Sequence, residues 1–315
     1  MAQSVNTNII SLNAQRNLST SQSSLATSMQ RLSSGLRVNS AKDDAAGLAI
    51  AERMSAQVRG MNVAVRNAND AISLSQTAEG ALGKIGDNLQ RMRELAVQSR
   101  NATNSTGDRA NLQKEFVQLQ EEINRTMEGT KFNGKGLFNG EGTSLEFQVG
   151  AGTTTEDKIT VDGVTLTGGT SSDAATAITA YDTDSTDATA IADIMATAVG
   201  AWDGSAGIAI GGDDGSGTDA STTQIDDAIN IIDKALDLVN DKRASFGAAQ
   251  NRFEAVISNL QVNIENQSAA RGRIMDADFA TETSNLSRAQ ILQQAGGAMV
   301  AQANQLPQQV LSLLR

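Results

Sequence analysis

Apolar residues recur every three or four positions near both ends of the chain, whereas the middle follows no such period. The clearest stretch covers residues 225–264, where twelve positions step by four and three and ten of them are apolar. An apolar period of seven residues predicts a coiled-coil seam, which needs a partner helix. The residues expected to form this seam are Ile225, Ile229, Ile232, Leu236, Phe253, Ile257, Leu260 and Ile264.

The same periodicity predicts one long helix over residues 45–99 and a shorter one over 108–127. At 1.5 Å per residue the longer helix would extend about 80 Å, which indicates a rod and not a compact globule. Ser40 or Asp43 is expected to cap its start. Three glycines inside it, Gly80, Gly83 and Gly86, weaken the pattern and are expected to permit close approach of another helix.

Residues 4–40 and 286–314 carry a weaker version of the pattern. Leu18, Leu25 and Leu32 repeat at seven, and Leu292 and Met299 do so near the other end. Ser, Thr, Asn and Gln fill the remaining positions and are poor helix formers. We therefore expect both segments to be marginal in isolation and to find partners only in a polymer.

Short alternating runs between the helices predict a small amount of β-structure. The pairs Asn133-Gly134 and Asn139-Gly140 are turn signals. Asp162-Gly163 lies between alternating apolar residues and is the strongest hairpin signal of the chain. Residues 167–219 are rich in Gly, Ser, Thr and Asp, with one short amphipathic helix over 191–202, and are expected to form a loosely packed lobe or a long loop.

Composition removes several kinds of chemistry. The chain has no Cys and no His, which excludes thiol nucleophiles, histidine acid–base catalysis and the common zinc sites. The acidic runs at Asp182 and Asp213 do not fit the ligand spacing of calcium loops. We expect no enzymatic activity, no cofactor and no metal.

The net charge of −11 is concentrated in one region. Residues 151–217 contain eleven acidic residues and one basic residue, a charge of −10, so the rest carries only −1. Nearly neutral helices can associate with copies of themselves, and the absence of a basic patch argues against nucleic acid. Residues 1–12 do not resemble a secretory signal. The sequence contains no run of 18 apolar residues, so it predicts no membrane segment.

Several long motifs resemble bacterial flagellins. At the amino-terminal end these are residues 5–8, 11–15 and 32–47, the last reading LSSGLRVNSAKDDAAG. Residues 88–99, NLQRMRELAVQS, and the segments 293–295 and 306–315 are also similar to that family. The resemblance covers about residues 1–150 and 220–315, and nothing within 167–219 contributes to it.

The resemblance implies a mainly α fold: a long coiled-coil helical rod made from both chain ends, with a β-hairpin region and a small inserted outer lobe. Residues 1–44 and 273–315 would form the inner tube of a filament, and residues 45–167 and 220–272 the outer tube. Residues 168–219 would be a variable surface region. The implied function is that of a structural subunit which polymerises into the extracellular flagellar filament after export through the flagellar type III pathway.

The resemblance also implies partners beyond the homopolymer. Arg91, Leu95 and Glu115 match positions that a toll-like receptor of the host contacts in the family. Leu311, Leu313 and Leu314 match leucines that pack in the inner tube and that intracellular immune sensors recognise. The C-terminal segment matches the binding site of an export chaperone, and hook–filament junction and cap proteins are further expected partners.

Three other functions compete with this one. A hook–filament junction protein shares parts of both termini, although residues 88–99 and the C-terminal Leu-Leu-Arg favour a filament subunit. A secreted adhesin or effector would need a pocket or sugar-binding aromatic residues in 167–219, where only Tyr181 and Trp202 occur. A filament-displayed enzyme would need a base, a nucleophile or a metal cluster in the same region.

Overall fold

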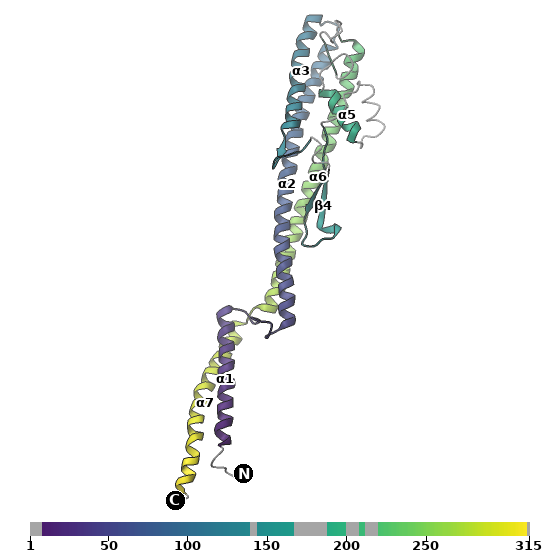
Figure 1. The fold of residues 1–315 in the computed structure, drawn as a ribbon. Coiled ribbons are helices and arrows are strands. Elements are labelled where there is room, and N and C mark those ends of the chain that lie inside the picture. The colour runs from purple at the N-terminus through teal and green to yellow at the C-terminus, as the bar shows by residue number, and fades with distance from the viewer. Residues whose placement is uncertain (1–7, 139–143, 167–187, 200–207, 212–219, 314–315) are drawn as a thin grey trace. The chain divides into compact units, whose positions relative to one another are not determined.

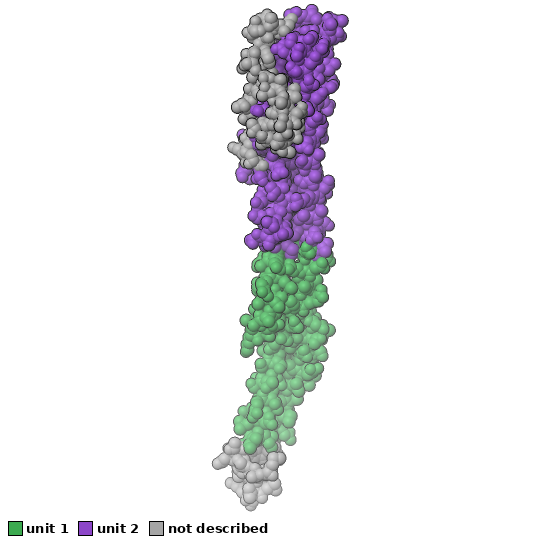
Figure 2. All heavy atoms as spheres, turned by 90° about the vertical axis from the view of Figure 1, so that its right-hand side faces the viewer, with its two compact units in different colours: residues 1–59, 263–315 green, residues 60–262 purple. Residues whose placement is uncertain are grey.

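The computed structural model describes residues 8–138, 144–166, 188–199, 208–211 and 220–313. The described chain divides into two compact units (Figure 2), residues 1–59 with 263–315 as unit 1 and residues 60–262 as unit 2. Helices α2 (Ala45–Ser99) and α6 (Thr222–Met275) contribute to both. The predicted mainly α fold with a β-hairpin region is confirmed. The boundary predicted at 44/45 falls at the start of α2, whereas that at 272/273 lies within the last turn of α6. The two compact units instead divide at 59/60 and 262/263, well inside the two helices.

Unit 2 is built on three helices, α2, α6 and α3 (Thr106–Gly129), which lie side by side in Figure 1. The α2 and α6 helices are antiparallel, since Arg100 pairs with Asp226 while Gln250 bonds to Glu79. The start of α3 is fixed by a capping box in which Ser105 and Asp108 bond to one another's backbone N–H groups. Both helices predicted for this region, over 45–99 and 108–127, are therefore confirmed.

Four of the eight residues predicted for the α6 seam are buried inside unit 2, whereas Ile229, Leu236, Ile257 and Ile264 are half-buried. Ile225, Ile232 and Phe253 are fully buried, and Leu260 is 8% exposed. Between 225 and 239 the buried stripe widens to include Ala228, Ile231, Ala235 and Leu238, next to α3 and the short helix α5 (Ala188–Val199) (Figure 1). Beyond 246 it narrows to one buried residue in seven, as expected for a two-helix contact.

The three helix glycines differ in their surroundings. A Cβ atom on Gly86 would lie 3.7 Å from Val239 Cγ1, an ordinary side-chain contact with α6. Gly80 and Gly83 have nothing within 4 Å of such an atom. None of the three therefore lies at a close approach of two helix backbones.

Of the two predicted Asn-Gly turns, the one within the described residues forms and closes a hairpin. Strands β1 (Lys131–Phe132) and β2 (Lys135–Gly136) pair through Asn133-Gly134, whose φ angles of 50° and 80° are those of a type I′ turn. Asn139-Gly140 lies outside the described residues.

The prediction that Asp162-Gly163 forms a hairpin turn was wrong. Strand β4 (Lys158–Asp162) pairs antiparallel with β3 (Ser144–Gln148), and Asp162-Gly163 follows the second strand. The loop 149–157 joins them and makes its own hydrogen bonds, because Asp157 caps the turn η1 (Thr155–Asp157) and its backbone carbonyl accepts from Val149 N at 2.7 Å. Val164 and Leu166 pack in the core without a strand partner.

Segments from the region expected to be a loose lobe are part of the unit 2 core. Ile194, Met195 and Ala198 of α5 are fully buried, and so is Ile210. The side chain of Gln113 accepts hydrogen bonds from Ile210 N at 2.8 Å and Gly211 N at 3.2 Å. The predicted short amphipathic helix is confirmed, but its packing is not loose.

Unit 1 contains the antiparallel pair of α1 (Ile9–Ser34) and α7 (Phe279–Leu313) (Figure 1). Gly35, with φ of 71°, ends α1 in the left-handed conformation that favours glycine. Neither residue expected to cap α2 does so. Asp44 accepts from Gly47 N at 2.8 Å at the first turn of α2, while Asp43 closes a turn with Ser40 just before it.

The segment that connects α1 to α2 is hydrogen-bonded to the segment that connects α6 to α7. Leu36 and Asp276 form an antiparallel bridge, with Arg37 N donating to Met275 O and Ala277 N to Gly35 O. Val38, Ala51 and Met275 bury a small apolar cluster at the same place. These contacts explain why the first turns of α2 and the last turns of α6 belong to unit 1.

Candidate assembly and recognition surfaces

The α1–α7 contact has an unusual division of residues between its inside and its outside. Its buried positions include Ser11, Ser28, Glu282, Ala289 and Ala303, all polar or small. Large apolar side chains lie on the outside of both helices. The segments expected to find partners only in a polymer thus pair within one chain, but that pairing leaves much of their apolar surface uncovered.

Exposed apolar residues are concentrated in unit 1. Of twelve large apolar residues that are exposed in the described chain, nine belong to unit 1, although it is the smaller of the two. The most exposed are Ile9 at 70%, Ile291 at 66% and Met299 at 65%. The others in unit 1 are Ile10, Leu12, Met29, Ile50, Phe279 and Leu292. Large apolar residues gathered on the surface of one unit mark a candidate site for contacts with other molecules.

The predicted receptor contacts do not share one surface. Arg91 is exposed on α2. Its guanidinium forms ion pairs with Glu115 on α3 and with Glu94, each at a distance of 2.8 Å. The hydrogen bonds in both ion pairs raise the pKa of Arg91, and the bond with Glu94 has the larger effect. Leu95 is fully buried in the core. Leu95 therefore offers no exposed surface in this structure, since spacing by four residues does not distinguish the rim of a helix face from its buried centre. Its contact with a receptor stays a prediction.

The expected subunit seam and the C-terminal leucines have different outcomes. Ile225, Ile232 and Phe253 are buried by packing within the chain, as expected for a seam that folds within one subunit against the helix over 45–99. Only the helical backbone of Leu311 and Leu313 is described, and Leu314 lies outside the described residues.

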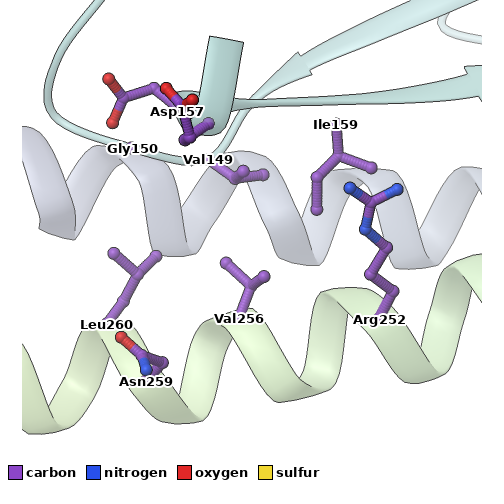
Figure 3. A pocket seen from close by; sticks show the side chains of 9 residues that line it. Val149, Gly150, Asp157, Ile159, Arg252, Val256, Asn259 and Leu260 are labelled. Atoms are coloured by element: carbon purple, nitrogen blue, oxygen red, sulfur yellow. The ribbon is translucent and has the colours of Figure 1, made fainter. Parts of the chain in front are cut away.

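A cleft of about 270 Å³ lies between the β3–β4 loop and α6 (Figure 3). Val149 and Ile159 approach it from the hairpin, and Arg252, Val256 and Leu260 from the helix. The Asp157 carboxylate in its lining accepts hydrogen bonds from the hydroxyl and the backbone N–H of Thr154 and so stabilises the loop. These hydrogen bonds lower the pKa of the Asp157 carboxyl. Among the described residues no three potential metal ligands of the His, Cys, Asp and Glu types lie together, and no helix is long and apolar enough to cross a bilayer.

These features define a class of protein: a helical structural chain with one well-packed unit and a second unit that presents apolar surface. The family described as the bacterial flagellin N-terminal helical region matches residues 5–143, and the bacterial flagellin C-terminal helical region matches residues 229–314. The chain belongs to the bacterial flagellin family. It is a structural subunit of the extracellular flagellar filament and not an enzyme.

Relatives at full length support this assignment. A flagellin of Serratia marcescens is 46% identical over 365 aligned residues, and one of Xenorhabdus nematophila is 46% identical over 330; both alignments cover all of both chains. A solved structure from Vibrio parahaemolyticus, assigned as a flagellar hook-associated protein, covers 74% of this chain and all of its own with a TM-score of 0.54. At 14% identity that likeness concerns the fold alone.

Proposed function

We propose that polymerisation is driven by the exposed apolar residues of α1 and α7, which bind neighbouring copies of the chain. The observation that carries this proposal is the exposure of Ile9, Ile291 and Met299 on helices whose mutual contact is small and polar. Covering this surface removes apolar area from water at each added subunit. A head-to-tail contact that does not close on itself generates a helical fibre.

The same reasoning assigns the segments to layers of the filament. Residues 1–44 and 273–315 form the inner tube, where their apolar faces meet those of other copies. Residues 45–167 and 220–272 form the outer tube, together with α5 and Ile210, which pack in the unit 2 core. The rest of 168–219, with its excess of acidic groups, is proposed as the variable surface region. The concentration of exposed apolar residues in unit 1 supports this order.

Assembly is coupled to ordering of the terminal helices. The α1–α7 pair buries few large side chains, so its contact offsets little of the conformational entropy lost on helix formation. Contacts with neighbouring copies supply the remainder. The chain thus has a stable unit 2 and a unit 1 that completes its packing in the filament.

The test is extension of filament seeds by the full chain carrying Ile291→Gln and Met299→Gln. We expect the extension rate to fall at least about tenfold, because each substitution places an amide in the apolar contact. The matched control, Ile291→Leu with Met299→Leu, keeps the surface apolar and should extend seeds at nearly the normal rate. Normal extension by the glutamine variant would contradict the proposal, provided that urea unfolding of unit 2 is unchanged.

Family membership supports a proposal for the export route and the accessory partners. We infer export through the flagellar type III pathway, with a chaperone covering the C-terminal segment and with contacts to hook–filament junction and cap proteins. The exposed residues Ile291, Leu292 and Met299 offer the apolar face that a chaperone would cover before assembly. Calorimetric binding of the chaperone should weaken in the glutamine variant; equal affinity would place the chaperone elsewhere.

Recognition by a toll-like receptor of the host is a second candidate function. The exposed group of Arg91, Glu94 and Glu115 on α2 and α3 supports it, with Leu95 acting only as a buried support. Arg91→Ala should lower receptor activation by the monomer about tenfold or more, because a charged contact is lost. Arg125→Ala removes another exposed arginine of an ion pair and is the control. Leu311, Leu313 and Leu314 remain proposed contacts of intracellular sensors, to be tested by Leu313→Ala in a sensor-activation assay.

A further inference from the structure

The apolar side chains in the α1–α7 contact are too few and too regularly spaced to define one register of the two helices. Leu18, Leu25 and Leu32 are its half-buried leucines in α1, and they repeat at intervals of seven. On α7, Gly296 lies opposite Leu18, since a Cβ atom on Gly296 would be 3.2 Å from Leu18 Cδ1. The other buried apolar residues of α7, Ala289 and Ala303, are also small. Sliding α1 by one heptad, about 10 Å, would place leucines again over small residues. Apolar packing alone therefore leaves several registers of similar energy.

Polar contacts at one end of the pair are specific to the observed register. Asn8 Nδ2 donates to Ala303 O at 2.7 Å, and Ser11 Oγ donates to Asn304 Oδ1 at 2.7 Å. Asn8 Oδ1 also accepts from Ser11 N and so caps the start of α1. A shift of one turn would break both contacts with α7.

A second polar contact lies at the opposite end. Arg31 Nη1 is 3.8 Å from Glu282 Oε2, and the Glu282 side chain is only 9% exposed. The Nε atom of Arg31 is buried without a hydrogen-bond partner among the described residues. A groove of about 440 Å³ that includes Ser28, Asn285 and Arg288 runs beside them. Removing one partner of an ion pair that is buried to this degree leaves a charge without compensation, which is destabilising.

We propose that Arg31–Glu282, together with Asn8–Ala303 and Ser11–Asn304, fixes the register of α1 against α7. Buried polar groups can specify register in helix pairs at some cost in stability. Here they do so in place of an apolar seam, which leaves the large apolar residues on the outside. The proposal rests on the proposed function in one respect: the register determines which apolar residues of α1 and α7 lie at the same level for a neighbouring copy.

The chain offers a direct reporter of this register. A Cβ atom on Gly296 would lie 3.7 Å from Leu18 Cβ, within the 3.5–4.5 Å range of disulfides. Because the sequence contains no other cysteine, Leu18→Cys with Gly296→Cys gives one possible intrachain bond. A slip of one turn, about 5.4 Å, prevents it. We expect efficient crosslinking on mild oxidation of filaments grown from the reduced protein.

Charge reversal then tests the ion pair in this cysteine background. Arg31→Glu alone and Glu282→Arg alone should each lower the crosslink yield at least about fivefold, since each places two like charges together in a partly buried site. The double reversal restores an attractive pair at the same level and should return the yield to near that of the parent. Arg288→Glu changes a charge in the same groove without reversing the pair and should leave the yield unchanged.

Three results would overturn the register proposal: no crosslink in the parent, unchanged yields in the single reversals, or failure of the double reversal to restore the yield. An equal loss with Arg288→Glu would also overturn it, because the effect would then be general electrostatics. Restoration by the double reversal cannot come from misfolded chains. If the reduced parent does not extend seeds although the wild type does, crosslinking of the soluble chain still measures the register. If the wild type itself fails to extend seeds, the proposed function fails, independently of the crosslink result.

Discussion

The side-chain amide of Gln120 donates a hydrogen bond to the backbone carbonyl of Ala198 over 3.1 Å in the interior of unit 2. This contact ties α5 to α3, and Ile194 and Met195 add fully buried apolar surface beside it. Part of the compositionally biased middle of the chain is therefore a structural element of unit 2. A deletion designed from composition alone would remove it.

Removal of residues 168–219 is expected to destabilise unit 2 strongly, whereas removal of 168–187 is expected to be tolerated. The longer deletion exposes the core around Phe116 and Ile123, both fully buried. It also removes the partner of Gln113, leaving a polar group without its hydrogen bonds. Urea unfolding followed by circular dichroism compares the two. Equal stability would show that α5 and residues 208–211 contribute nothing.

A single substitution makes the same point without shortening the chain. Ile194→Ala should lower the free energy of unfolding of unit 2 by roughly 2–5 kcal/mol through loss of buried apolar contacts. Ile291→Ala, on the exposed surface of unit 1, is the control and should leave unit 2 unchanged. A loss below about 0.5 kcal/mol at Ile194 is the range of ordinary surface substitutions and would argue against its burial.

Gly60 and Gly80 should respond oppositely to alanine. A Cβ on Gly60 would lie 2.9 Å from Ala151 Cβ, so Gly60→Ala must displace the β3–β4 loop from α2. Gly80 has open space around it, and Gly80→Ala should stabilise α2 by about 0.5–1 kcal/mol through helix propensity alone. We expect a lower unfolding midpoint for the first variant and a higher one for the second. A higher midpoint for both would show that the loop yields without cost.

The contact of Phe147 with Phe253 should be the main link between the hairpin and α6. Their rings meet edge to face with centroids 5.6 Å apart, and Phe253 is fully buried. Phe253→Ala should cost roughly 3–5 kcal/mol, and Phe253→Leu much less because most of the volume remains. Equal unfolding midpoints for the two variants would indicate that ring packing is unimportant there.

Acid should weaken the α2–α6 contact through Asp226. Its hydrogen bond from Arg100 lowers the pKa of the Asp226 carboxyl below the ordinary 3.8. A carboxyl with a depressed folded-state pKa stabilises the fold above its unfolded pKa, and that stabilisation is lost as the pH falls through the folded pKa. Asp226→Asn should therefore reduce the pH dependence of the unfolding free energy below about pH 4.

Urea titrations at pH 7, 4 and 3 measure this effect. Asp237→Asn on the same helix is the control, since no ion pair joins Asp237 to another described residue. Identical acid dependence of the Asp226 variant and the wild type would mean that the pairing with Arg100 does not persist in solution.

The sequence predicted best those features that depend on local pattern. The period of seven located Ile225, Ile232 and Phe253 in the core, and Asn133-Gly134 identified a two-residue turn. Asp162-Gly163 failed because the bonds that Asp157 makes within the loop outweigh a local turn preference. Those bonds are recognisable only when the loop is seen folded.

The sequence does not predict which side chains of α1 face α7, for a different reason. Both faces of each helix carry apolar residues, so periodicity does not decide whether Leu25 or Met29 faces the partner helix. In the structure Leu25 is half-buried and Met29 is 58% exposed. The choice is made by polar contacts such as Ser11–Asn304, whose partners lie far apart in the sequence. Likewise, only the fold separates the exposed Arg91 from the buried Leu95.

The bond from Asn8 to Ala303 joins residues 295 positions apart, and the bridge of Leu36 with Asp276 also closes nearly the whole chain. Contacts of such long range form late, because the entropy of closing the loop must be offset before they stabilise anything. Unit 2 needs only residues 60–262, which allows it to fold first and bring the two ends together. The apolar surface of unit 1 is then assembled in its final arrangement only after almost the entire polypeptide is present. An incomplete chain, which lacks one of the two ends, cannot present this surface to the polymer.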